Sequence, residues 1–509
     1  MKKILFLFLL CFITFNTHCQ TSFNKLYSPY GNNPSTSFGS SSIIAKGCDY
    51  IIVACGFDTL YNDYQTLHFY KLDTLGNLTK LHSFSHDSIN YYFSYSSLIQ
   101  TYNGGCFYAS DMNDITSTVG NTIHYMIRFD QNMDTLWTKI LPHDTIWEAI
   151  RQVRETSDKG FIFVGSRNIS PSDDIDVLLI KTDSMGNQLW RKIIPMPNVS
   201  GGGRILETPD KGFLINGYSE STAQGDGNPF LMKTDSAGNV IWAKIIGGNE
   251  YDGGGGMAIT MQGDYLFAYG YSTYTYPFNE DWSARLNIIK YAPDGSVIWN
   301  RMYDTIRNYL GVCKIQVLPN NDFIVMGNHS LKDSANFFPS FLFKFNANGD
   351  SLWRKIYYVA DKFGDRNLLA DNVLNADGSI TACGWVDGDT LVPYEQIWLL
   401  KTDSMGYAPG PQNVGIIDLP YLYVGYGELK VFPNPAKEFL TAEYSINKPA
   451  KEVLLLITDM QGRLLIKQQL TTKTNQALVD VRNLKSGSYH CTLMLDGKQK
   501  AVAKVIIKH

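Results

Sequence analysis

One ten-residue segment recurs seven times along the chain, and this repetition constrains the fold more than any other feature. The segment is KTDSMGNQLW at 181–190 and KTDSAGNVIW at 233–242. The copies begin 52 to 57 residues apart, at Lys71, Arg128, Lys181, Lys233, Lys290, Lys344 and Lys401. Repetition at such a period indicates an array in which each unit packs against its neighbours.

Each copy predicts a β-hairpin, because apolar strands flank a short turn. Asp183-Ser184-Met185-Gly186 matches a type I turn followed by a left-handed glycine. Another copy has Pro293 at the second turn position, where this turn favours proline. The copy at 128 has Met133 in place of the glycine, so we expect its turn to differ.

Two further short strands precede each hairpin, so one unit has four strands. Seven such units predict an all-β chain with a seven-bladed β-propeller over residues 20–408. The last unit lacks its fourth strand, since Gly410 stands where the other copies have tryptophan. Residues 23–27 resemble this missing strand. We therefore expect the N-terminal segment to complete the last blade and close the ring, which removes exposed sheet edges.

The repeat resembles the secreted propeller repeats common in Bacteroidota, whose blades carry a Lys-x-Asp-x-x-Gly hairpin followed by Trp-x-Lys. The resemblance covers residues 20 to about 408 and implies architecture, because this fold serves many functions. Sialidase and quinoprotein blades space their Asp and Gly differently. Lys181, Asp183, Gly186 and Trp190 are thus expected to form a turn and a contact between blades.

A separate C-terminal domain is predicted at 429–509, after a Pro- and Gly-containing linker at 409–428. Its short apolar strands, separated by turns, indicate a small β-sandwich of the Ig-like type. Three motifs stand out, and their key residues are Pro433, Asn434, Pro435, Asp459, Gly462, Gly487 and Tyr489. They resemble the type A C-terminal sorting domain of the type IX secretion system. The resemblance implies that the secretion machinery recognises this domain and that a sortase cleaves it, with surface attachment or release.

Residues 1–19 are predicted to be a cleavable secretory signal peptide, because Lys2 and Lys3 precede an apolar run of about a dozen residues. This run is too short to span a bilayer, and no transmembrane segment is expected elsewhere. Lipidation at Cys19 is the alternative, but residues 16–18 lack the pattern that precedes a lipidated cysteine. We therefore expect a secreted or outer-membrane surface-attached protein. Its remaining cysteines should be buried thiols, with Cys55 and Cys383 the one pair worth testing for a disulfide.

Charge and motifs exclude several classes of function. A formal net charge of −4 disfavours nucleic acid as a partner. No HExxH, Cys/His cluster, P-loop or Gly-x-Ser-x-Gly motif occurs, so we expect no metal, no cofactor and no identifiable catalytic residue. The favoured function is a non-enzymatic module that binds a glycan or a protein. The alternative is a propeller-fold glycan hydrolase or lyase that uses carboxylates.

The expected strand alternation places tight turns on one rim of the ring and longer connections on the other. Variable loops on a rigid scaffold commonly carry binding sites, so the long-loop rim is the candidate. Aromatic side chains beside polar ones suit sugar rings or a protein surface. The candidate ligand-binding residues are Tyr251, Asp252, Tyr274, Trp282, Arg366 and Trp385.

Overall fold

The computed structural model describes most of the chain apart from its N-terminal segment, several connections and the linker. The described residues are 22–27, 38–46, 49–58, 64–84, 89–91, 97–114, 122–141, 147–168, 175–196, 200–221, 226–248, 252–272, 283–307, 310–329, 338–359, 366–387, 396–408, 429–444, 450–459, 463–470 and 476–509. Every regular element in these ranges is a β-strand. Among them there is no helix with the length and hydropathy to cross a membrane.

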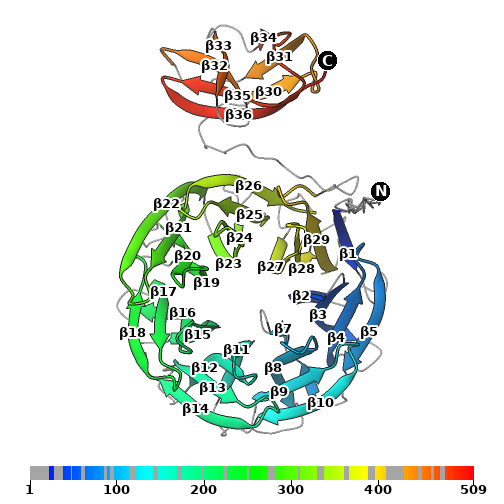
Figure 1. Ribbon diagram of the computed structural model, residues 1–509, viewed down its shortest axis with the longest axis vertical. Coiled ribbons are helices and arrows are strands. Elements are labelled where there is room, and N and C mark those ends of the chain that lie inside the picture. The colour runs from blue at the N-terminus through cyan, green and yellow to red at the C-terminus, as the bar shows by residue number, and fades with distance from the viewer. Residues whose placement is uncertain are drawn as a thin grey trace, which may run out of the picture.

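Seven antiparallel sheets, numbered here as blades 1 to 7, surround a central channel (Figure 1). Blade 1 consists of β2 (Phe38–Lys46), β3 (Asp49–Asp58), β4 (Tyr64–Leu72) and β5 (Leu78–Phe84). Blade 2 consists of β6 (Ile89–Tyr91), β7 (Leu98–Gln100), β8 (Cys106–Asp114), β9 (Thr122–Phe129) and β10 (Thr135–Leu141). Blade 3 consists of β11 (Glu148–Glu155), β12 (Phe161–Asn168), β13 (Ile175–Thr182) and β14 (Gln188–Ile194).

The second half of the ring continues in the same order, with the first strand of each blade nearest the channel (Figure 1). Blade 4 consists of β15 (Ser200–Glu207), β16 (Phe213–Ser221), β17 (Asp226–Thr234) and β18 (Val240–Ile245). Blade 5 consists of β19 (Gly253–Ile259), β20 (Tyr265–Ser272), β21 (Ser283–Tyr291) and β22 (Val297–Arg307). Blade 6 consists of β23 (Leu310–Val317), β24 (Phe323–His329), β25 (Ser340–Phe345) and β26 (Ser351–Tyr357).

Blade 7 joins the two ends of the ring. It consists of β27 (Arg366–Leu374), β28 (Ile380–Asp387), β29 (Gln396–Thr402) and, as its outer strand, β1 (Phe23–Tyr27). The antiparallel register runs from Phe23 opposite Lys401 to Tyr27 opposite Ile397. The indole Nε1 of the fully buried Trp398 donates to Asn24 Oδ1 at 2.6 Å. The N-terminal strand thus supplies the pairing that the seventh repeat lacks.

The repeated hairpin turn is held by its aspartate and by the preceding blade. Asp183 Oδ1 accepts hydrogen bonds from the backbone of Met185 and Asn187, at 2.9 and 2.8 Å. Gly186 has φ +78°, and a Cβ there would lie 2.9 Å from the ring of Trp137 in blade 2. The glycine is therefore required twice, by its backbone conformation and by the tryptophan that packs on it.

This contact recurs around the ring, because the outer strand of each blade reaches the hairpin turn of the next. Lys139 Nζ donates to Met185 O at 2.6 Å and to Asn187 Oδ1 at 2.9 Å. Trp242 Nε1 donates to Pro293 O at 3.2 Å, and Tyr357 OH donates to Gly406 O at 2.6 Å. The interpretation of the repeat signature as a turn and a contact between blades is confirmed.

The expectation that the turn at Met133 differs is wrong. Met133 takes the left-handed conformation of the glycines, with φ +66°, and Asp130 Oδ1 binds the backbone of Asn132 and Asp134 as in the other copies. The Met133 side chain is 1% exposed and belongs to the apolar cluster between blades 1 and 2. Burial of this side chain offsets the cost of a positive φ in a residue with a Cβ.

The C-terminal domain is a two-sheet sandwich around its own apolar core. One sheet has the order β30 (Leu429–Phe432), β31 (Phe439–Tyr444) and β34 (Gln476–Asp480). The other has the order β33 (Leu464–Gln469), β32 (Val453–Asp459), β35 (Gly487–Leu495) and β36 (Lys498–Ile507).

Most of the C-terminal motif residues hold this sandwich together. Asn434, between Pro433 and Pro435, uses its side-chain amide as a strand would, since it donates to Lys504 O and accepts from Ile506 N, both at 2.8 Å. Asp459 accepts from the Arg463 backbone at 2.9 Å. Gly487 begins β35, and Tyr489 OH donates to Lys485 O at 2.7 Å. Gly462 lies outside the described residues.

The described cysteines form no disulfide with one another: Cys55, Cys106, Cys313, Cys383 and Cys491. Cys55 and Cys383 are both buried and are not joined to each other. Cys48 and the segment predicted as the signal peptide lie outside the described residues.

The contact between glycine and tryptophan can be measured by two alanine substitutions at glycines of nearly equal φ. Gly186→Ala and Gly378→Ala should each cost about 1–2 kcal/mol from the left-handed backbone. Gly186→Ala should cost roughly 1–3 kcal/mol more, because its Cβ meets Trp137, whereas the nearest atom at Gly378 is Ser404 Cβ at 3.4 Å. Urea unfolding of both variants measures the difference, and equal losses would contradict this role for the tryptophan.

Candidate functional site

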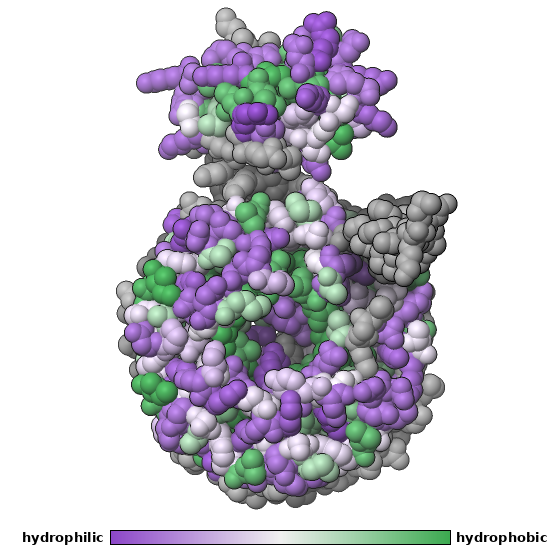
Figure 2. Space-filling view, in the orientation of Figure 1, coloured by the Kyte–Doolittle hydropathy of each residue, from purple (hydrophilic) through white to green (hydrophobic). Residues whose placement is uncertain are grey.

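A cavity of about 680 Å³ occupies one end of the central channel. Its lining comes from the first halves of the inner strands of blades 3 to 7 and from the ends of the strands beside them. These positions adjoin the longer connections rather than the tight turns. The space-filling view shows the ring hollowed at its centre (Figure 2). The cavity therefore lies at the predicted long-loop rim.

A β-bulge recurs in the inner strands and selects the side chains that line this cavity. The pairing shifts between Ile150 and Gln152 in blade 3, between Val312 and Lys314 in blade 6, and at matching positions in blades 1, 4, 5 and 7. A bulge leaves an extra residue unpaired and re-aims its side chain. The extra residues that line the cavity are Arg151, Gly203, Gly254, Gly255, Cys313 and Ala370. One backbone feature thus presents a different side chain from each blade.

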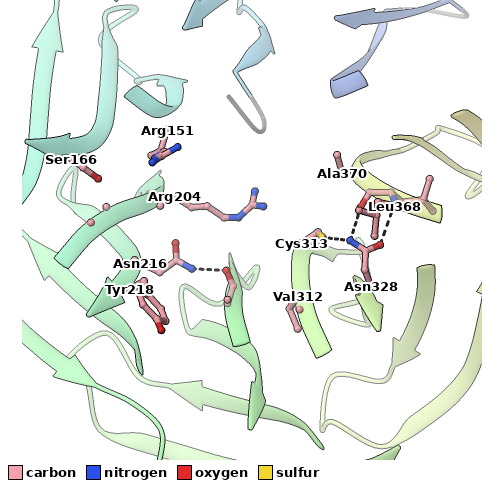
Figure 3. Close-up of a pocket in the computed structure, with 18 of the residues that line it drawn as sticks. Arg151, Ser166, Arg204, Asn216, Tyr218, Val312, Cys313, Asn328, Leu368 and Ala370 are labelled. Atoms are coloured by element: carbon pink, nitrogen blue, oxygen red, sulfur yellow. Dashed lines mark hydrogen bonds between the residues drawn. The ribbon is translucent and has the colours of Figure 1, made fainter. Parts of the chain in front are cut away.

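Three arginines line the cavity, and no described lining residue is acidic. The guanidinium groups of Arg151 and Arg204 point into the open space (Figure 3). Arg366 lies on the opposite side, at the start of β27. Arg151 is exposed and has no ion pair or hydrogen bond with any side chain in the described ranges. The described lining therefore carries net positive charge.

The positive lining continues toward the tight-turn rim, where two spaces of about 350 and 370 Å³ extend the channel. Arg154 and Lys314 line both. Burial lowers the pKa of Arg154 to about 10, with attraction by Asp371 opposing this and repulsion by Arg204 adding to it. Arg154 therefore stays protonated at neutral pH. Lys314 Nζ donates to Asp371 Oδ1 at 2.7 Å.

Aromatic side chains stand at the mouth of the cavity on opposite sides. The Arg366 guanidinium lies 5.0 Å from the centre of the Trp385 ring, which is the geometry of a cation–π contact. Trp147, before β11, is 42% exposed and lines the other side. Tyr218 and Phe338 complete the aromatic lining. The site therefore combines flat apolar faces with fixed positive charges.

Buried amides hold the blades together around the cavity. Asn216 Nδ2 donates to Gly255 O at 2.7 Å, which links blades 4 and 5 (Figure 3). Asn328 binds the backbone N and O of Leu369 at 3.3 and 3.4 Å, which links blades 6 and 7. Asn328 also donates to Cys313 Sγ at 3.2 Å. Burial raises the pKa of the Cys313 thiol to about 11, so the group is neutral near pH 7 and unsuited to nucleophilic attack.

Of the ligand-binding residues expected from the sequence, the structure brings Arg366 and Trp385 together in the cavity. Asp252 is fully buried and does not line it. Its carboxylate binds the backbone N–H groups of Gly248 and Ser272, at 2.8 and 2.7 Å, and so holds the connection between blades 4 and 5. Tyr251, Tyr274 and Trp282 lie outside the described residues.

Sequence reasoning missed Trp147, Arg151, Arg204 and Tyr218. Arg151, Arg204 and Tyr218 lie on strands, whereas the search was directed mainly at the connections between strands. Trp147 lies in a connection, just before β11, and was overlooked. A signal was present in the strands themselves. Arg151 is the extra residue of the bulge in blade 3, and Arg204 directly follows the extra residue of the bulge in blade 4, whereas the bulge of blade 5 contains glycine. Both arginines, at or beside the bulge of an innermost strand, line the cavity.

A second group of charged residues is buried between blades 2 and 3. His124 Nδ1 lies 2.8 Å from Asp111 Oδ1, and its Nε2 lies 3.1 Å from Glu148 Oε2. Glu148 also contacts Arg191 at 2.6 Å and Arg167 at 3.5 Å. Burial lowers the pKa of His124, but the hydrogen bonds to both carboxylates outweigh it, so the net shift is upward. This cluster pairs two carboxylates with His124 and two arginines and joins blades 2 and 3.

The His124 cluster should make stability depend on pH. A histidine whose pKa is raised by folding contributes stability that is complete below its unfolded pKa of about 6.5 and is lost as the pH rises through the folded value. The unfolding free energy of the wild type should therefore exceed that of His124→Gln most at acidic pH, with the gap narrowing as pH rises above about 6.5. Urea titrations from pH 5.5 to 8.5 measure the gap, and a gap that widens with pH would contradict this assignment.

Residues 430–508 match the family described as the secretion system C-terminal sorting domain. This is a type IX sorting domain, which implies an origin in Bacteroidota. The protein is therefore a β-propeller exported by the type IX secretion system to the cell surface or the medium. No curated protein matches the chain.

Solved structures resemble the propeller at low identity. A protein of unknown function from Dyadobacter fermentans matches at 11% identity over 74% of this chain and 98% of its own, with a TM-score of 0.43. A polysaccharide lyase of family PL25, an ulvan lyase, matches at 8% identity over 73% and 95%, with a TM-score of 0.49. The WD40 domain of Neurospora crassa Pan2 matches at 8% identity over 77% and 98%, with a TM-score of 0.43. At these identities the likeness concerns the fold alone.

Proposed function

We propose that the propeller is a carbohydrate-binding module and that its site is the cavity at the long-loop rim. The observation that carries this proposal is the pair formed by Arg366 and Trp385, which lines the same cavity as the exposed Trp147. A tryptophan held by a cation–π contact offers a rigid face for an apolar sugar surface, and the arginine beside it offers hydrogen-bond donors to hydroxyl or acidic oxygens.

The size of the cavity favours a small ligand or the end of a chain over a protein surface. At about 680 Å³ it lies within the roughly 300–1,000 Å³ that is usual for small-molecule sites. A stable protein interface buries about 800 Å² on each partner, and a concave cavity at the end of a channel admits only a narrow part of such a surface. A short saccharide fits both the volume and the lining.

The alternative function, a glycan hydrolase or lyase, needs groups that transfer protons at the sugar. Glycoside hydrolysis commonly uses a pair of carboxyl groups about 5–10 Å apart. The described lining offers arginine, amide and aromatic groups, and these support recognition of a ligand. The buried carboxylates of Asp111 and Glu148 are engaged by His124 and two arginines. Binding is therefore the function that the described residues support best.

Substitution of the two cavity tryptophans tests the site. A glycan array with the wild type first identifies a ligand, and calorimetry then gives its Kd. Trp147→Ala and Trp385→Ala should each weaken binding by about 2 kcal/mol, or roughly 30-fold, since stacking anchors dominate such sites. The matched control is Tyr102→Ala, which removes a 63% exposed aromatic ring from a tight turn. Unchanged binding by both tryptophan variants, with loss of binding in the control, would refute the proposed site.

We further propose that a sortase removes the C-terminal domain within residues 409–428, so that this domain serves as an address. The strands of the propeller end at Thr402 and those of the sandwich begin at Leu429, so cleavage between them leaves both folds complete. Intact mass of the protein from the surface or medium should show a C-terminus before Leu429. A surface product that still ends at His509 would contradict the cleavage, and surface delivery of a chain lacking 429–509 would contradict the address.

A further inference from the structure

We infer that the ligand of the cavity is an acidic saccharide, one whose sugar rings carry carboxylate or sulfate groups. This inference rests on the proposed function and narrows it. Its basis is the distribution of charge along the channel, which is opposite to that of the propeller as a whole.

The propeller and linker are acidic, but the channel is not. Residues 20–428 contain 29 Lys or Arg and 42 Asp or Glu. Within this acidic background, Arg151, Arg204 and Arg366 line the main cavity, and no described lining residue there is acidic. Arg154 and Lys314 extend the positive lining toward the other rim. Five cations along one channel of an acidic ring form a local positive field that attracts anions.

The carboxylates that border the narrower part of the channel already have partners. Asp371 accepts from Lys314 Nζ, from the backbone of Asn372 and from that of Ile43. Glu207 binds the backbone N and the hydroxyl of Ser157, both at 2.8 Å. Asp371 thus pairs with Lys314 and Glu207 holds a tight turn, and the five cations that line the channel outnumber these two carboxylates.

Arginine is suited to the acidic groups of saccharides. Its planar guanidinium donates two parallel hydrogen bonds to a carboxylate or a sulfate, and these bonds are stronger than those between neutral groups. Arg151 is carried on a bulge, exposed, and without a partner among the described side chains, so its donors are available to a ligand. The flanking tryptophans supply the apolar faces that a sugar ring requires and that a free inorganic anion would not use.

A nucleic acid strand combines rings and negative charge as well, but the surface fits it less. A polyphosphate backbone needs a continuous basic track, whereas these cations converge in one cavity of an acidic ring. A few acidic groups beside stacked sugar rings match the cavity better.

The experiment compares the full chain with two charge variants of equal net charge. Arg151→Gln with Arg204→Gln removes two cations from the cavity. Lys211→Gln with Lys244→Gln removes two exposed cations from a tight turn and from the outer strand β18. The probes are oligogalacturonate, sulfated dextran oligomers and neutral dextran oligomers of matched length, with a single-stranded oligonucleotide as a further probe. Thermal melting shows that each variant is folded, and calorimetry gives each Kd.

We expect the wild type to bind oligogalacturonate or sulfated dextran at least tenfold more tightly than neutral dextran. The cavity variant should lose that preference by tenfold or more, whereas the control variant should keep it. The acidic probe that binds distinguishes carboxylate from sulfate recognition.

Two results would overturn the inference and leave the proposed function standing. In the first, the wild type binds neutral dextran more tightly than either acidic probe, and this binding depends on Trp385. In the second, the cavity variant and the control variant lose equal affinity for the acidic probe. Preference for the oligonucleotide, or binding of no saccharide by probe or array, would overturn both.

Discussion

The ring depends on one type of contact, in which an aromatic ring on the outer strand of a blade packs against the left-handed glycine of the next blade's hairpin. This contact occurs at six of the seven junctions between blades, and at the seventh Met133 takes the place of the glycine. Trp137 on Gly186 is one instance, and Trp353 on Gly406 is another. Because the glycine has no Cβ, the indole reaches the backbone and excludes water from the turn. The same hairpin aspartate closes its own turn and orients it toward the neighbour. The recurring decapeptide therefore encodes the hairpin turn of a blade and, in the five copies that contain tryptophan, its contact with the next blade.

The contacts described above are made by the outer strands and the hairpin turns and not by the inner strands. Inner-strand residues such as Ile150 and Val153 belong to the core, whereas the bulge residues face the cavity and differ from blade to blade. The bulge permits this variation, since it presents Arg151 in blade 3 and Cys313 in blade 6 from one backbone geometry. The residues that recur in every repeat thus define the architecture, whereas the residues that differ between repeats line the candidate site.

The sequence predicted the architecture well because its signals are local. The hairpin turns, the strand count and the N-terminal strand of blade 7 all follow from short patterns with known geometry. Met133 shows the limit of such reasoning, since its left-handed turn is stabilised by burial against residues of another blade. The site was predicted only in part. Arg366 and Trp385 both line the cavity because they are neighbours on paired strands. Asp252 is instead buried, and Trp147 reaches the cavity from another blade. Both of these outcomes depend on tertiary packing that no short sequence pattern contains.

Closure of the ring by its first strand has a consequence for the order of events during export. Asn24 and Trp398 meet across 374 residues, so a chain that emerges from its N-terminus holds an unpaired strand until β29 is available. The sorting domain begins only after that strand, at 430–508. Any chain long enough to carry the address is therefore also long enough to close the ring, and a truncated chain with an open, aggregation-prone edge lacks the signal for delivery to the surface.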